Sequence, residues 1–98
     1  MQIRWSPGSA QDLEQIFDYI RTDNTAAAQR VVQTIYDRAH VLATDPYLGR
    51  RGRVDGTREL PMPPLPFIVV YRVLEHVDAV EVVNVIHGAQ RWPPLTKE

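Results

Sequence analysis

The residues best suited to chemistry lie near the end of the chain, directly after an apolar run at residues 80–86. A β-branched run of this kind is typical of a strand in a sheet core. Four side chains with reactive or binding groups follow it: His87, Gln90, Arg91 and Trp92. We therefore expect an imidazole, an amide, a guanidinium and an indole at a sheet edge, where they could bind or cleave a partner.

Metal-independent RNA cleavage is one reaction that these residue types could perform. It needs a base for the 2′-hydroxyl, an acid for the leaving oxygen and cations for the phosphorane charge. His87 could be the base or the acid, and three arginines could hold the phosphate: Arg58, Arg72 and Arg91. His87 could equally be a polar residue at a strand end that makes one hydrogen bond.

Three candidate side chains have structural interpretations beside the functional ones. Tyr71 could be an acid, but it stands in an apolar strand, where a tyrosine is more often part of the core. Arg72 either pairs with Glu81 across a hairpin or faces the open side of the sheet. Trp92 either packs a terminal turn or stacks on a base.

The composition argues against several other chemistries. The sequence contains no Cys, which excludes disulfides, thiolate metal sites and a Cys nucleophile and fits a reducing compartment. It also lacks a glycine-rich phosphate loop and the HExxH and GxSxG motifs. The three histidines, at positions 40, 76 and 87, lie far apart without carboxylates at ligand spacing. We therefore expect neither a metal site nor a cofactor.

Charge and length favour a single soluble domain over residues 1–98. The net charge of −1 provides no general attraction to nucleic acid. Four arginines nevertheless gather between positions 47 and 60, against only two acidic residues: Arg50, Arg51, Arg53 and Arg58. The start of the chain does not read as a signal peptide, and no apolar run approaches the roughly 20 residues of a membrane helix. We expect a cytoplasmic protein.

Hydrophobic periodicity predicts a short strand and two helices in the first half of the chain. Ile3 and Trp5 indicate a strand, and Ser6 followed by Pro7 is typical of a helix start. Asp12 and Glu14 are expected to complement the dipole of this helix. The second helix is predicted at residues 25–43, with the cap at position 23 or 24.

Three strands are predicted in the second half. Residues 57–60 indicate a short strand after an irregular, glycine-containing loop, and the prolines from 61 to 66 indicate a turn or an edge. Strands at residues 67–74 and 80–86 are joined by a hairpin at 75–78. The order β-α-α-β-β-β predicts an α+β fold in which a helical hairpin covers one face of a small, mostly antiparallel sheet.

Several segments, in this order, resemble the RelE/ParE toxin superfamily. They are Trp5-Ser6-Pro7, Asp12-Leu13-Glu14-Gln15-Ile16, Tyr19-Ile20, Pro46-Tyr47-Leu48-Gly49-Arg50, Thr57-Arg58-Glu59-Leu60, Val69-Val70-Tyr71-Arg72-Val73 and Val85-Ile86-His87-Gly88. The resemblance implies a bacterial toxin of a type II toxin–antitoxin pair, of the kind associated with plasmid stabilisation. It also implies a cognate antitoxin, of ribbon-helix-helix type, whose disordered segment folds around the toxin.

The resemblance leaves two activities open and favours the ParE-like one, inhibition of DNA gyrase by binding. For that activity five residues are predicted at the target-binding surface: Arg58, His87, Gln90, Arg91 and Trp92. The alternative is a ribosome-dependent mRNA endoribonuclease of RelE type, in which His87, Arg58, Arg72 and Arg91 would be catalytic. A third possibility is an antitoxin-binding module without toxicity.

The chain departs from the RelE-type nucleases at three places. Ile68 occupies the position of an arginine in their Tyr-Arg-Leu-Val-Tyr pattern, and of their basic preceding strand only Arg58 remains. Their C-terminal basic cluster and tyrosine are matched only by Arg91 and Trp92. Loss of one oxyanion donor costs an enzyme roughly 3 kcal/mol of transition-state stabilisation. These departures favour a toxin that acts by binding.

Overall fold

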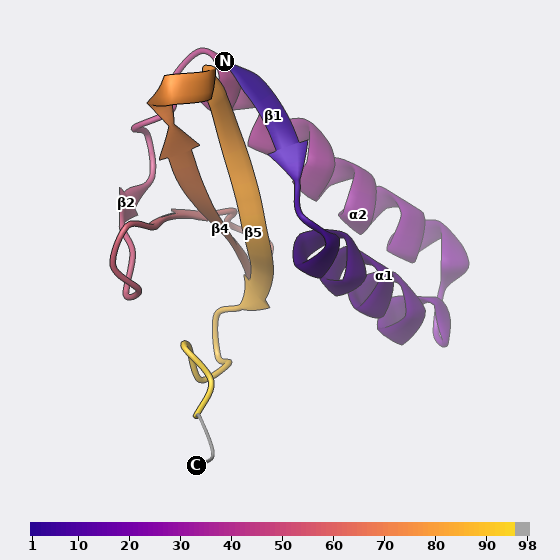
Figure 1. Cartoon of the computed structure of the whole chain (residues 1–98). Helices are drawn as coiled ribbons and strands as arrows, with labels where there is room; N and C mark the ends of the chain where they lie inside the picture. Colours follow the sequence, from indigo (N-terminus) through magenta and orange to yellow (C-terminus); the bar gives the residue numbers. More distant parts are fainter. Residues whose placement is uncertain (96–98) are drawn as a thin grey trace.

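Two helices pack against one face of a five-stranded sheet in the computed structural model, which describes residues 1–95 (Figure 1). The elements are β1 (Gln2–Trp5), α1 (Pro7–Arg21), α2 (Thr25–Ala39), a 3₁₀ helix (His40–Ala43), β2 (Arg50–Arg51), β3 (Arg58–Pro61), β4 (Phe67–Leu74), a 3₁₀ turn (Glu75–Val77) and β5 (Ala79–His87). The predicted α+β class is confirmed. None of the helices in residues 1–95 combines the length and apolar character needed to span a bilayer.

The helix starts follow the predicted capping chemistry. The Ser6 hydroxyl accepts the Ser9 N–H at 3.1 Å, with Pro7 at the first helical position. Asn24, rather than position 23, caps α2 through a 2.9 Å bond from the Ala27 N–H. The second helix was predicted to continue as an α-helix to residue 43, which is wrong: α2 ends at Ala39, and residues 40–43 form a 3₁₀ helix. Tighter 3₁₀ turns of this kind are common at the ends of α-helices.

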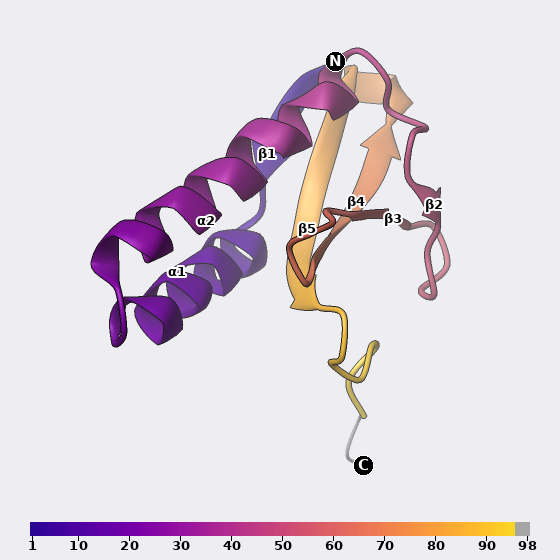
Figure 2. The same ribbon diagram turned by 180° about the vertical axis from the view of Figure 1, so that it is seen from behind.

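The sheet has the strand order β1-β5-β4-β3-β2. β1 runs parallel to β5, and the other three pairings are antiparallel, so the mostly antiparallel prediction is confirmed. Strand β2 was not predicted. It contains only Arg50 and Arg51, too few residues to show an alternating pattern, and it pairs with β3 at the edge of the sheet (Figure 2).

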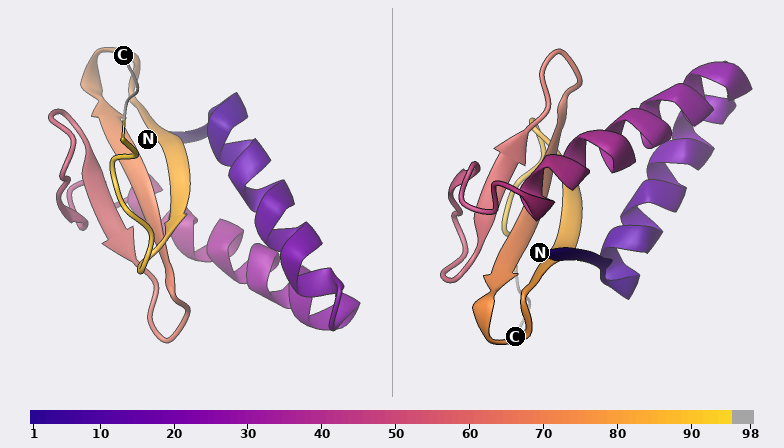
Figure 3. Two further views of the ribbon diagram at one scale, coloured as in Figure 1. Left: turned by 90° about the horizontal axis from the view of Figure 1, so that it is seen from below. Right: turned by 90° about the horizontal axis from the view of Figure 1, so that it is seen from above.

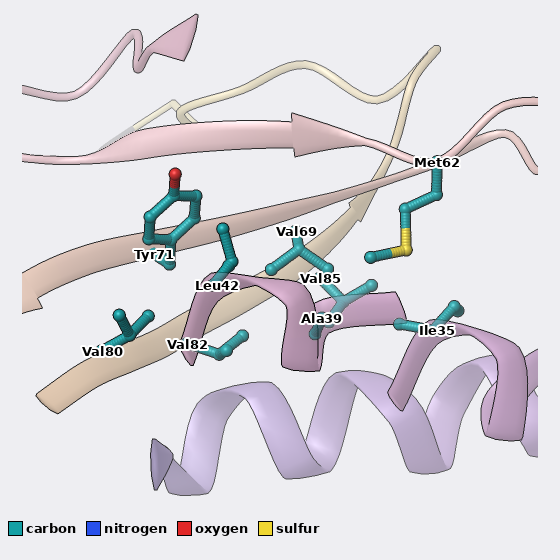
Figure 4. Packing of buried hydrophobic residues seen from close by; sticks show 9 residues of the cluster. All are labelled: Ile35, Ala39, Leu42, Met62, Val69, Tyr71, Val80, Val82 and Val85. Atoms are coloured by element: carbon teal, nitrogen blue, oxygen red, sulfur yellow. The ribbon is translucent and has the colours of Figure 1, made fainter. Parts of the chain in front are cut away.

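Both faces of β4 are buried over residues 68–71, which explains the apolar sequence of that part of the strand. One face packs on the helices, and Figure 4 shows nine residues of this core: Ile35, Ala39, Leu42, Met62, Val69, Tyr71, Val80, Val82 and Val85. The other face, turned away from the helices, is called the open face below. It holds a smaller buried cluster of Ile68, Val70 and Ile86, which contacts Val83 and Trp92.

Candidate functional site

His87 ends β5 and is held by its neighbours in one orientation. It pairs with Phe67 of β4, and the two rings meet edge to face with centroids 5.6 Å apart. The imidazole Nδ1 accepts the Ala89 N–H at 3.0 Å. Since Nδ1 is the acceptor, the neutral ring carries its proton on Nε2 and presents a donor to solvent. In this arrangement His87 is suited to donating a hydrogen bond rather than to acting as a base.

A tight turn follows His87 and fixes the direction of the chain. The His87 N–H donates to Gln90 Oε1 at 3.1 Å, and the Gln90 N–H donates to the His87 carbonyl at 2.9 Å. The Gly88 N–H donates to the Pro66 carbonyl at 2.7 Å, which ties the turn to the loop before β4. His87 and Gln90 are thus brought together by this turn.

Arg91 and Trp92 follow this turn and differ in their exposure to solvent. The Arg91 side chain is exposed. Trp92 is half-buried and packs on the open face of the sheet against Ile68, Val70 and Ile86. Trp92 therefore packs in this structure, but on the sheet rather than in a terminal turn as predicted.

Arg58 lies at the other end of the sheet. It pairs with Tyr71 of β4, its Nη1 donates to the Gly49 carbonyl at 2.6 Å, and its guanidinium carbon lies 5.1 Å from the centre of the Tyr47 ring. The Tyr47 hydroxyl donates to Glu75, and this hydrogen bond raises the pKa of Tyr47. Tyr71 is fully buried, so its interpretation as a core residue is confirmed.

Arg72 forms an ion pair with a carboxylate on the open face. Its Nη2 lies 2.5 Å from Glu81 Oε1 on the paired residue of β5, which confirms the predicted cross-strand pair. His87 and Arg58 are matched to β4 positions four residues apart, which corresponds to about 13 Å along a strand. The four predicted catalytic side chains are therefore not brought to one point in this structure. Within residues 1–95, no three His, Asp or Glu side chains are placed to hold a metal.

Asp12 has a role that sequence reasoning missed. The helix dipole prediction was wrong for Asp12, because it lies beyond the first turn of α1 and binds β5 instead. Its Oδ2 accepts the Val85 N–H at 2.8 Å and the Asn84 side-chain amide at 2.9 Å. At this point β5 carries a bulge that leaves Val83 without a partner on β4. The polar Asn84 inside an apolar run was the available indication.

Glu59 is the second residue that was missed. Its side chain is only 1% exposed, on the same strand as Arg58. Arg53 donates to it from its backbone N–H at 2.9 Å and from its guanidinium at 3.0 and 3.1 Å, and Arg50 adds a contact of 3.1 Å. The hydrogen bonds from Arg53, above all, lower the pKa of Glu59 to about 2. Two of the four clustered arginines thus hold the loop rather than an external phosphate.

Two hollows flank the candidate residues. An apolar groove of about 480 Å³ runs between α1 and the end of β5, with Ile16, Val31 and Phe67 in its wall and His87 and Gln90 at its rim. A more polar hollow of about 560 Å³ lies beside Arg58 at the opposite end of the sheet.

Comparison with known proteins adds relatives over nearly the full chain. A family model described as "ParE toxin of type II toxin-antitoxin system, parDE" matches residues 3–92. A Sinorhizobium fredii protein named "Putative toxin Y4kP" is 39% identical over 94 residues, covering 96% of this chain and 95% of that protein.

The fold is also similar to solved structures. A chain of the chromosomal ParDE system from P. aeruginosa is 26% identical with a TM-score of 0.78, over 89% of this chain and 95% of that one. The RelBE2 complex from Mycobacterium tuberculosis matches at 18% identity and a TM-score of 0.67, over 88% and 95%. The E. coli RelBE complex matches at 11% and 0.57, over 92% and 98%. The last two similarities concern the fold alone.

Proposed function

The chain belongs to the family of ParE toxins of type II toxin–antitoxin systems, and we propose that it acts by binding DNA gyrase and inhibiting it. The family match supports this choice over the RelE-type reaction, because the two solved RelBE relatives are less similar in both sequence and fold than the ParDE relative.

The observation that carries the proposal is the separation of the groups that a nuclease would need. A general acid or base must come within hydrogen-bond reach of its proton, and cations must surround the same phosphate. Here His87 and Arg58 are matched to β4 positions four residues apart, and Arg72 is paired with Glu81. A toxin that works by contact has no such requirement, since its binding residues can be spread over a surface.

We propose that the target-binding surface contains five residues: Arg58, His87, Gln90, Arg91 and Trp92. His87 and Gln90 supply polar groups at a rigid turn, and Arg91 supplies an exposed guanidinium beside them. Arginine is suited to such a role because its planar fork can bind carboxylates bidentately.

We also propose that a cognate antitoxin neutralises the chain. The related solved structures are of ParDE and RelBE systems, which pair a toxin with an antitoxin. The expected partner is a ribbon-helix-helix protein with a disordered segment that folds on binding. The apolar groove between α1 and β5 offers surface that such a segment could bury.

The test is inhibition of purified gyrase. The protein is added to a DNA supercoiling reaction, and a parallel cell-free translation reaction receives the same amount. We expect supercoiling to stop while translation continues, and Arg91→Ala to weaken the inhibition. Arg21→Ala is the matched control, since Arg21 is also exposed but lies at the end of α1.

Full gyrase activity at an excess of toxin would overturn the proposal. Blocked translation with cut transcripts would then favour the mRNA endoribonuclease, and His87→Ala should abolish that activity. No effect in either reaction, together with normal growth on overexpression, would favour an antitoxin-binding module without toxicity.

A further inference from the structure

The chain after β5 contacts the open face of the sheet through Trp92. The C-terminal segment, defined here as residues 88–95, extends past the end of β5 in Figure 1 and passes in front of the sheet in the left view of Figure 3. The contacts of Trp92 with Ile68, Val70 and Ile86 place this segment against the sheet. Part of the open face is therefore covered by Trp92.

This segment is held at two points, and Arg91 lies between them. The first point is the turn at His87–Gln90, whose hydrogen bonds reach back to Pro66. The second point is the Trp92 side chain on the sheet. Because the residues on both sides of Arg91 are fixed, the direction of its exposed side chain depends on both attachments.

The second attachment rests on apolar contact. Among the described residues, the buried Trp92 Nε1–H has no hydrogen-bond partner, so no polar contact of the indole helps to hold it. A hollow of about 320 Å³ lies beside the ring, between Trp92 and Pro93 on one side and Val54 and Arg72 on the other. The segment is thus not packed along its length, and the ring is its main contact with the sheet.

We propose that Trp92 is a positioning residue for target binding, which acts by docking the C-terminal segment on the open face and so orienting Arg91. The proposal rests on the proposed function: within the five-residue target-binding surface, it gives Trp92 the role of supporting Arg91, which makes the direct contact. It predicts that an aromatic ring of similar size can replace Trp92, since packing and not the N–H is what matters.

A double-mutant cycle separates this role from a general structural one. We expect Arg91→Ala and Trp92→Ala each to raise the half-inhibitory concentration for gyrase about tenfold, and the double variant to be no worse than either by more than about twofold. Trp92→Phe should stay close to the wild type. Additive losses, or a Trp92→Phe variant as weak as Trp92→Ala, would overturn the proposal.

Fluorescence tests the docking without any target. Trp5→Phe leaves Trp92 as the only tryptophan, because the chain has two. Its emission should be shielded from acrylamide in the folded protein and become fully accessible in urea. An emission as accessible before unfolding as after it would show that the ring is not docked.

A milder substitution provides a second test in case Trp92→Ala does not fold. Val83→Ala trims the apolar wall of the hollow that Trp92 also lines, so it should increase quenching of Trp92 and weaken inhibition, but not further weaken the Arg91→Ala variant. Unchanged inhibition despite a released ring would refute the positioning role. If the wild type leaves gyrase active, the gyrase proposal fails, and the same cycle scored in the translation reaction decides the role of Trp92 there.

Discussion

Replacement of Glu59 by glutamine should lower stability in a way that depends on pH. The carboxylate is almost completely buried and receives its hydrogen bonds from Arg53 and Arg50, which hold the loop before β3 against the sheet. Glutamine keeps the size of the side chain but removes the negative charge, so both guanidinium groups lose their counter-ion.

The magnitude follows from the pKa. The pKa of Glu59 falls from 4.5 to about 2 in the folded protein. At about 1.4 kcal/mol for each pKa unit, this corresponds to about 3 kcal/mol of stabilisation. The two arginine side chains are 41% and 56% exposed, so solvent screening reduces the effect, and we expect about 2 kcal/mol. Because the folded pKa is the lower one, this stability is present above about pH 4.5 and is lost as the pH falls towards 2.

The assay is urea unfolding followed by circular dichroism at several pH values. At pH 7 the Glu59→Gln variant should unfold with a free energy lower by about 2 kcal/mol, and at pH 2.5 the gap should shrink to about 0.5 kcal/mol. Glu81→Gln is the matched control, because its pair with Arg72 is more exposed and should be worth less than about 1 kcal/mol. If Glu59→Gln lowers the free energy of unfolding by as much at pH 2.5 as at pH 7, the reasoning is refuted.

Three further substitutions test other parts of the structure by the same unfolding measurement. Tyr71→Phe removes a buried hydroxyl and leaves the Gly49 N–H without its acceptor, at a cost of about 2 kcal/mol; an unchanged midpoint would contradict this. Gly49→Ala should cost about 1–3 kcal/mol because its Cβ would lie 2.7 Å from the Tyr71 hydroxyl oxygen, whereas Gly88→Ala, with its nearest contact at 3.5 Å, should be nearly neutral. Asp12→Ala leaves the Val85 N–H unpaired and should cost about 1–3 kcal/mol, and a neutral result would mean that water replaces the carboxylate.

Local patterns were enough to predict most of the fold. Ser6 and Asn24 mark helix starts by accepting bonds from residues three positions away, and Pro7 stands at the first position of α1, so these signals are visible in a short stretch of sequence. The apolar runs of β4 and β5 were equally clear, since much of each strand is buried.

Roles that depend on distant partners could not be predicted. Asp12 binds the bulge of β5 more than 70 residues away, and nothing next to it in the sequence indicates that partner. Arg58 was predicted at the target-binding surface, or as a phosphate contact if the chain were a ribonuclease. The structure shows its guanidinium bonded to the Gly49 carbonyl and lying over Tyr47, contacts that require the folded loop.

The pairing of β1 with β5 has a consequence for synthesis of the chain. Gln2 pairs with Ala79, so within residues 1–95 the first strand has its only sheet neighbour in a strand that is translated much later. At about 5–20 residues per second, β1 waits roughly 4 to 15 seconds on the ribosome for β5 to be made. During that time the helical hairpin can form, but its apolar side has no complete sheet to cover. A chain that stops before Ala79 lacks the strand that joins β1 to β4, and it cannot assemble this fold.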